Sequence, residues 1–275
     1  MNSHPLTTAL LARCACALVL LGVTTNTGTA ATMVFGQTFY STNTGTSQSG
    51  GNLVWTTPTG ANAEMHTHFG PFTLAIGETF TVRFGLNFNE PQGDGGNAAE
   101  DGIRIGLLDV TTQTNADGAK AATTGEGYRY RFNWEGASTA PSGIAHERTA
   151  GGSNANYLTL SGGIWDSGQQ SFNGFGLNAD GTVTYPVSFS VQRTGANDAV
   201  ATLDINGISR TYTDPGDGAF SYDTFVLAKI GDVAPFNDAA TFTISNFSAA
   251  VVPEPSAAAL LICGLLPLGW RRRKV

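Results

Sequence analysis

The chain of 275 residues is long enough for one large domain or two small ones, and its composition excludes several classes of protein. Charged residues make up 13% and hydrophobic residues 41%, which is typical of a folded chain and not of a disordered one. The 35 glycines, together with many Thr, Asn and Ser, favour short strands and turns over long helices. Between residues 31 and 252, 20 acidic side chains oppose 9 basic ones, a net charge of −11. Such a charge repels phosphate backbones and excludes nucleic acid as a partner.

The first 30 residues have the features of a secretory signal peptide. One basic residue, Arg13, precedes a short apolar run that ends at Val23, and small and polar residues follow up to Ala31. The run has the ~7–15 apolar residues of a signal sequence and is too short for a stable membrane span. We therefore expect residues 1–30 to form a signal helix that the Sec machinery uses for export.

The cysteines lie at the two ends of the chain. Cys14 and Cys16 belong to the predicted signal peptide, and Cys263 lies near the C-terminus. The body between them has no cysteine, so we expect an exported domain without disulfides. Its stability must then come from a large core or from bound ions.

Residues 32–250 contain repeated segments in which apolar and polar residues alternate, separated by Gly, Asn, Asp or Pro. In segment 79–88 the alternation places five large apolar side chains on one face. Asn206-Gly207 predicts a two-residue hairpin, because both central residues of a type I′ turn need positive φ. The other clear segments are 128–134, 187–193, 199–205, 208–212, 225–230 and 240–247. This pattern predicts an all-β fold, an antiparallel β-sandwich, in a single domain of residues 32–250.

The order of these segments resembles that of concanavalin-A-like (laminin-G-like) jelly rolls. The early part of the resemblance is a strand that ends in Gly85-Leu-Asn-Phe88, a loop rich in Gly and Asn, and the run Asp101–Asp109. The late part is the Asn-Gly hairpin, a strand that starts at Tyr222 and a terminal strand around Phe242. The resemblance covers about 170 residues without an invariant chemical motif. It implies a jelly-roll sandwich and says little about function.

The last 24 residues, 252–275, form a pattern of three parts: Val252-Pro253-Glu254-Pro255-Ser256, an apolar run from Ala257 to Trp270, and Arg271-Arg272-Arg273-Lys274. This pattern closely resembles the PEP-CTERM sorting signal. The resemblance implies an exported protein of a Gram-negative bacterium that an exosortase receives and cuts at the Pro-Glu-Pro motif. The implied sorting residues are Pro253, Glu254, Pro255, Arg271, Arg272 and Arg273.

The apolar part of this tail suits a transient anchor. Fourteen helical residues reach roughly 21 Å, which is short of the ~30 Å hydrocarbon core of a bilayer. Basic residues beside a span stay on the cytoplasmic side, so the body would face the periplasm. We expect a short C-terminal hydrophobic helix with transient inner-membrane association, followed by release to the cell surface or extracellular matrix. A permanent single-pass anchor remains the alternative.

No catalytic motif is recognisable in the sequence. The Glu-x-Asp-x-x-Glu motif that the resembled fold carries in retaining glycosidases is absent, as is the Gly-x-Ser-x-Gly elbow of serine hydrolases. The body has three histidines without a local triad signature. We therefore expect no enzymatic activity. Carboxylates from different strands can still meet in space, so a hydrolase remains an alternative.

Two histidines form a candidate site for a transition metal. In an extended strand, His66 and His68 point to one side together with Glu64, and these are suitable ligand types. The interpretation that we favour is a solvated polar face of an edge strand.

The loop of residues 89–101 is a candidate calcium site, and no other cofactor is expected. It gathers four carboxylates and two Asn side chains among glycines, and Ca²⁺ prefers such oxygen ligands. The candidate ligands are Asp94, Asn97, Glu100 and Asp101. A solvated acidic loop without an ion is the alternative.

Segment 128–134 offers candidate sugar-binding residues. Tyr128, Tyr130 and Trp134 are rings on which a sugar can stack, and Arg129 and Arg131 lie on the opposite face as hydrogen-bond donors. For any single ring we favour a place in the core, because a domain of this size needs large inward side chains.

Together these patterns favour a non-catalytic, exported jelly-roll domain that binds a polysaccharide at the cell surface or in an exopolysaccharide matrix. Two other functions stay open. One is a glycan-active hydrolase on the same fold, which needs two carboxylates that converge in a groove. The other is a passive structural or adhesive matrix protein.

Overall fold

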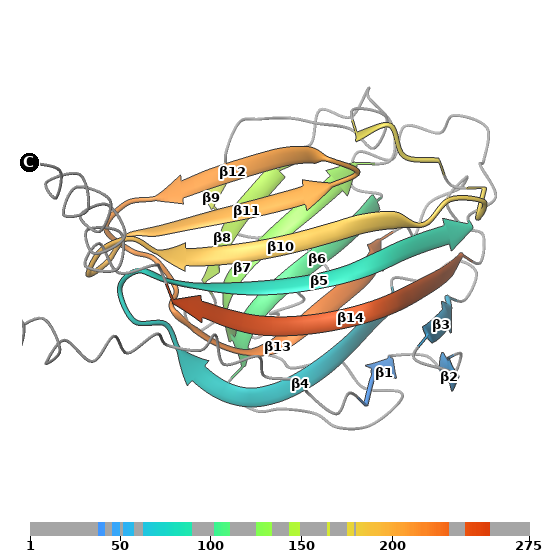
Figure 1. Ribbon diagram of the computed structural model, residues 1–275, viewed down its shortest axis with the longest axis horizontal. Coiled ribbons are helices and arrows are strands. Elements are labelled where there is room, and N and C mark those ends of the chain that lie inside the picture. Colours follow the sequence, from blue (N-terminus) through green and yellow to red (C-terminus); the bar gives the residue numbers. More distant parts are fainter. Residues whose placement is uncertain are drawn as a thin grey trace, which may run out of the picture. The chain divides into compact units, whose positions relative to one another are not determined.

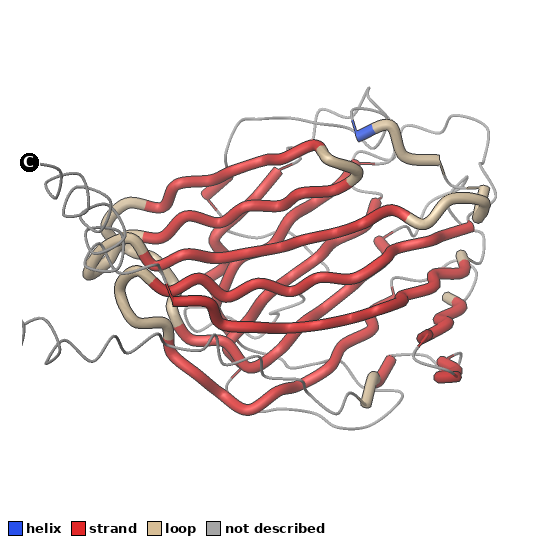
Figure 2. The backbone as a smooth tube through the Cα atoms, in the orientation of Figure 1, coloured by secondary structure: helices blue, strands red, loops and turns tan. Residues whose placement is uncertain are grey.

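The computed structural model describes residues 38–41, 46–49, 52–57, 63–89, 102–110, 125–133, 143–148, 164–165, 175–178, 180–230 and 240–253. Nearly all regular structure in these ranges is β-strand (Figure 2). Within them, no helix has the length and apolar character needed to cross a membrane. The two predicted terminal helices lie outside the described residues.

The described strands form two antiparallel sheets (Figure 1). Sheet A has the spatial order β1 (Tyr40–Ser41), β4 (Ala63–Thr73), β13 (Ser221–Ile230), β6 (Gly102–Val110), β7 (Gly125–Asn133), β8 (Gly143–Arg148) and β9 (Ile164–Trp165). Sheet B has the order β12 (Ile208–Asp214), β11 (Ala199–Ile205), β10 (Tyr185–Arg193), β5 (Glu78–Asn89), β14 (Thr241–Pro253), β3 (Asn52–Thr56) and β2 (Thr46–Ser49).

The chain passes back and forth between the sheets. It runs from β4 in sheet A to β5 in sheet B, returns for β6 to β9, crosses again for β10 to β12, and ends with β13 in sheet A and β14 in sheet B. Strands that are distant in sequence therefore become neighbours, as β5 and β14 do in Figure 1. This arrangement confirms the predicted antiparallel sandwich of the jelly-roll type.

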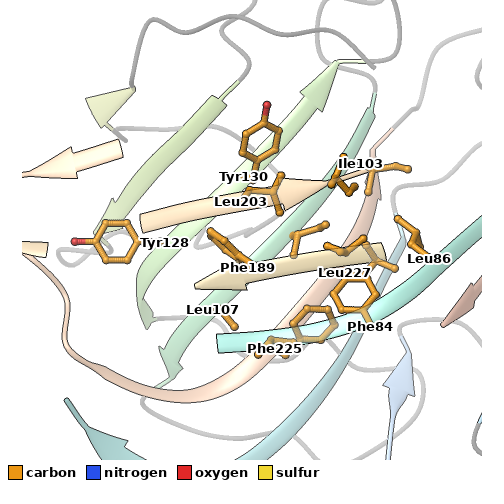
Figure 3. Packing of buried hydrophobic residues seen from close by; sticks show 14 of the residues in the cluster. Phe84, Leu86, Ile103, Leu107, Tyr128, Tyr130, Phe189, Leu203, Phe225 and Leu227 are labelled. Atoms are coloured by element: carbon orange, nitrogen blue, oxygen red, sulfur yellow. The ribbon is translucent and has the colours of Figure 1, made fainter. Parts of the chain in front are cut away.

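Alternating side chains build the core between the two sheets. On β5, the predicted apolar face of Phe80, Val82, Phe84, Leu86 and Phe88 is buried. Phe84 meets Phe225 of sheet A edge-to-face, with ring centroids 5.3 Å apart, in the packing that Figure 3 shows. The large apolar area removed from water stabilises the sandwich without disulfides.

The predicted hairpin is confirmed between β11 and β12. Asn206 has φ of 54° and Gly207 has φ of 76°, as a type I′ turn requires. Ile205 and Ile208 consequently lie opposite each other, and the register continues to Ala199 and Asp214.

A β-bulge divides β14 into two halves. Three residue steps from Ser245 to Ser248 span the same length as two steps on β5, from Gly85 to Arg83. Asn246 accommodates the extra residue with φ of 52°. The bulge reverses the alternation, so that Ile244 before it and Ala249 after it both face the core.

Candidate functional site

An open groove crosses the outward face of sheet B over β5, β10, β11 and β14. Its volume is about 510 Å³, within the ~300–1,000 Å³ range of small-ligand sites. Arg83, Gly85, Ser188, Asp204 and Asn246 are among its lining residues. The groove therefore combines a guanidinium, a carboxylate, a hydroxyl and an amide around a glycine.

Gly85 makes the close approach of the groove walls possible. Phe84 and Leu86 face the core, so residue 85 faces outward. A Cβ atom at this position would lie 2.5 Å from Ser245 Oγ and 2.8 Å from Thr184 Cγ2. Both atoms belong to side chains that line the groove, so a larger residue would push the walls apart.

Hydrogen bonds hold the segment of residues 180–184, which ends at Thr184 in the groove wall. Asn87 Nδ2 donates to the carbonyl oxygens of Gly181, at 2.8 Å, and Val183, at 3.0 Å. The Thr182 side chain and backbone N–H donate to the Asp180 carboxylate, and these hydrogen bonds lower the pKa of Asp180. The wall is therefore ordered before any ligand binds.

Arg83 and Asp204 lie in one row across the groove. Ser188 is in register with Arg83 on one side and with Asp204 on the other. Because neighbouring strands are ~4.8 Å apart, the two charged residues are separated by about 9.6 Å at Cα. Ser209 Oγ donates to Asp204 Oδ2 at 2.6 Å, which orients the carboxylate.

A second group of polar residues lies where β7 and β8 of sheet A meet β12 of sheet B. Tyr128 Oη donates to Asp214 Oδ2 at 2.9 Å, and His146 Nδ1 lies 2.6 Å from the same oxygen. His146 Nε2 lies 3.1 Å from Glu126 Oε1. The imidazole occupies the space between the two carboxylates, where a paired-carboxylate hydrolase needs the glycosidic bond. Glu126 and Asp214 are therefore bridged by His146 and do not have the arrangement of a hydrolase's two carboxylates.

Burial and like charges favour the neutral forms of several groups in this region. Burial raises the pKa of Tyr128, and the charge of Asp214 adds to the shift. Burial also raises the pKa of Tyr222, whose Oη donates to the carbonyl oxygen of Ala219 at 2.7 Å. Partial burial, followed by the charges of Asp223 and Glu126, raises the pKa of Asp109. Both tyrosine hydroxyls thus act as hydrogen-bond donors, that of Tyr128 from sheet A to sheet B and that of Tyr222 to the loop that precedes its own strand.

The histidine pair lies on the outward face of sheet A. Glu64, His66 and His68 share one face of β4, as predicted, and His66 Nδ1 lies 3.5 Å from Glu64 Oε1. The interpretation of a solvated edge strand is wrong, because β4 pairs with both β1 and β13 and because Glu64 and His66 are fully buried. His68 Nδ1 is 2.8 Å from Thr224 Oγ1. Across the described ranges, no three His, Cys, Asp or Glu residues are arranged to hold a metal ion.

The predicted sugar-binding residues divide between the two faces of β7. Tyr128 and Tyr130 are fully buried between the sheets, as Figure 3 shows, so neither ring can stack on a sugar. This corrects the stacking role and agrees with the core interpretation. Arg129 and Arg131 lie on the opposite face and are at most 2% exposed. Trp134 lies outside the described residues.

Most other predicted site residues also lie outside the described ranges. These are the calcium ligands Asp94, Asn97, Glu100 and Asp101, and the sorting residues Glu254, Pro255, Arg271, Arg272 and Arg273. Pro253 is described and forms the last residue of β14.

Sequence reasoning missed the groove. Its residues come from strands that are far apart in the chain, and none belongs to a recognisable catalytic or ligand-binding motif. Gly85 is the residue that could have indicated the groove, because a glycine inside a strongly alternating strand often marks a place where a ligand or another chain segment comes close to the backbone.

Comparison with known proteins finds no matching family model and no matching curated protein. Solved structures do match the chain. The chain is similar in fold to lectin-like domains. The metal-free carbohydrate recognition domain of Emp46p is 9% identical with a TM-score of 0.48, over 80% of this chain and 88% of that chain. A legume lectin-like domain from Entamoeba histolytica is 10% identical with a TM-score of 0.47, over 79% and 90%.

A third similar structure is the exoplasmic/lumenal domain of VIP36 in a form bound to Ca²⁺ and Man3GlcNAc. It is 12% identical to this chain with a TM-score of 0.43, and the match covers 80% of this chain and 84% of that one. The ion and the sugar are properties of that protein.

Proposed function

We propose that this chain is a non-catalytic, exported domain that binds a glycan in the groove of sheet B. The observation that supports the proposal is the open groove over Gly85, whose walls carry polar side chains and whose wall residue Thr184 ends a segment held by hydrogen bonds of the domain itself. Hydroxyl, amide, carboxylate and guanidinium groups are suitable partners for sugar hydroxyls. Because the walls are ordered in advance, a ligand loses little binding energy in ordering them.

The surface beside the groove also suits a longer glycan. Ser190, Thr202 and Thr211 lie in one row across β10, β11 and β12. Thr202 Oγ1 and Thr211 Oγ1 are 3.2 Å apart. A polysaccharide that extends beyond the groove would therefore meet further hydroxyl groups.

A substitution at the base of the groove tests this function. We expect Gly85→Ala in the full chain to weaken glycan binding at least about tenfold on a glycan array, because the new Cβ displaces Ser245 and Thr184. Gly70→Ala on β4 is the matched control, since a Cβ at Gly70 meets no atom within 4 Å. Circular dichroism should show both variants folded.

Two results would contradict the proposal. If Gly85→Ala binds as well as the unsubstituted chain, the groove is not the binding site. If the folded, unsubstituted chain binds no glycan on the array, a passive matrix protein becomes the better description.

We further propose that the domain reaches the cell surface or the exopolysaccharide matrix by export and exosortase sorting. The signal peptide of residues 1–30 and the tail of residues 252–275 support this route. Replacing Pro253, Glu254 and Pro255 with Ala in a Gram-negative host that has an exosortase should leave the protein uncleaved in the inner membrane. Cell fractionation and the mass of the released protein measure the effect. Unchanged release and mass would contradict sorting at this motif.

A further inference from the structure

We infer that the groove selects an anionic sugar, whose carboxylate Arg83 binds, next to a neutral sugar unit at Asp204. This inference rests on the proposed glycan-binding function and names the class of glycan. It starts from the distribution of charge over sheet B.

The outward face of sheet B has very few charges. Among the outward-facing positions of its described strands, Arg83 and Asp204 are the charged residues, and both line the groove. The other outward positions carry mainly Thr, Ser, Asn and Gln. A polar face with its two opposite charges gathered in one groove is suited to a ligand with a defined charge pattern.

Arg83 can accept an anionic group. Its side chain is exposed, and within the described part of the chain its guanidinium makes no hydrogen bond or ion pair. A guanidinium binds a carboxylate through two parallel hydrogen bonds, which gives direction as well as affinity. Because the body of the chain has a net charge of −11, an acidic glycan is repelled elsewhere and needs such a cation to bind.

Asp204 determines which sugar unit binds at the other end of the groove. Its carboxylate, oriented by Ser209, repels a second acidic group and accepts hydrogen bonds from sugar hydroxyls. The row through Ser188 places it about 9.6 Å from Arg83 at Cα, which leaves room for two adjoining sugar rings. A polymer in which uronic acid and neutral units alternate fits this pattern better than a polymer of uronic acid alone.

Matched ligands test the inference on the full chain. The probes are a hyaluronan decasaccharide, in which acidic and neutral units alternate, and the same oligosaccharide after reduction of its carboxyl groups. We expect about tenfold tighter binding of the acidic form, measured by calorimetry at low salt, with the difference declining as salt is added. Arg83→Gln should bind both forms equally, and Arg83→Lys should keep part of the preference. Asp204→Asn should keep the preference for the acidic form.

The possible failures are distinguishable. Equal binding of both forms by the unsubstituted chain, still weakened by Gly85→Ala, would overturn this inference and leave the glycan-binding groove intact. No binding of these or any arrayed glycan would overturn both proposals. Dextran sulfate and dextran form the second pair of probes. A preference for dextran sulfate that depends on Arg83, without one for hyaluronan, would overturn the choice of a carboxylate in favour of a sulfate ester.

Discussion

Pro253 lies opposite Glu78 in the antiparallel register of β14 and β5. The first residue of the Pro-Glu-Pro motif is therefore the last residue of the final strand. β5 pairs with both halves of β14. β3 pairs only with the earlier half, from Thr241 to Ser245. The motif consequently begins at the sheet itself, in the half of β14 that has one paired neighbour among the described strands.

This relationship predicts that the last six residues of β14 stabilise the domain. A chain that ends at Pro253 keeps all pairs with β5, and a chain that ends at Phe247 loses those from Ser248 onward. The buried Ala249 and the half-buried Val251 are lost with them, so we expect a cost of at least ~1 kcal/mol. The melting temperature of the shorter chain should fall by ~2–4 °C or more. Equal melting temperatures would contradict the assigned register.

The bulge in β14 makes position 246 sensitive to the shape of its residue. Asn246 has φ of 52°, a region that Gly and Asn enter readily and β-branched residues do not. We expect Asn246→Val to cost ~1–2 kcal/mol and Asn246→Gly to cost much less. Thermal unfolding of the two variants measures the difference. If both cost the same, the positive φ is not what Asn246 supplies.

The hydrogen bond between Tyr128 and Asp214 joins the two sheets inside the sandwich. Removing the hydroxyl in Tyr128→Phe leaves Asp214 with one donor fewer in a buried position, so we expect a cost of ~1–3 kcal/mol. Asp214→Asn should also destabilise the domain. Because the two residues interact directly, the double variant should lose less than the sum of the single variants in urea unfolding. Additive losses would show that the pair is not coupled.

The raised pKa of Asp109 gives a dependence of stability on pH. Burial and the charges of Asp223 and Glu126 favour the protonated form in the folded state. Stability from this group is therefore fully present below the ordinary Asp pKa of ~3.9 and is lost as the pH rises through the raised value. Asp109→Asn should be more stable than the unsubstituted protein at pH 7 and equal to it near pH 3. Thermal unfolding at the two pH values tests this sign, and a benefit that persists at pH 3 would contradict it.

Calcium remains a prediction from the loop of residues 89–101. If Asp94, Asn97, Glu100 and Asp101 bind the ion, a calcium concentration of 100 times Kd should stabilise the full chain by about 2.7 kcal/mol. The shift in melting temperature between calcium and a chelator measures this effect. The double variant Asp94→Asn with Glu100→Gln should abolish the calcium shift. Asp204→Asn removes a carboxylate of the groove instead and should leave the calcium shift unchanged. A calcium shift that survives in the loop variant would place the ion elsewhere.

Local patterns in the sequence were sufficient for the long core strands and for one hairpin, but not for the shorter strands β2, β3, β8 and β9. The alternation in segment 79–88 predicted β5 and its inward face, because a strand with one buried face needs apolar residues at every second position. Asn206-Gly207 predicted the hairpin because the positive φ angles of a type I′ turn restrict the residue types. Both predictions rest on interactions within a few residues, which a sequence displays directly.

The groove and the choice of the inward face of β7 depended on the tertiary structure. On β7 the alternation separates Tyr128 from Arg129, but the packing against sheet B decides that the tyrosine is in the core. Arg83, Asp204 and Asn246 come together because β5, β11 and β14 join one sheet across long stretches of chain. The register between distant strands is set by the burial of a shared core. No local pattern in the sequence specifies which distant strands become neighbours in that core.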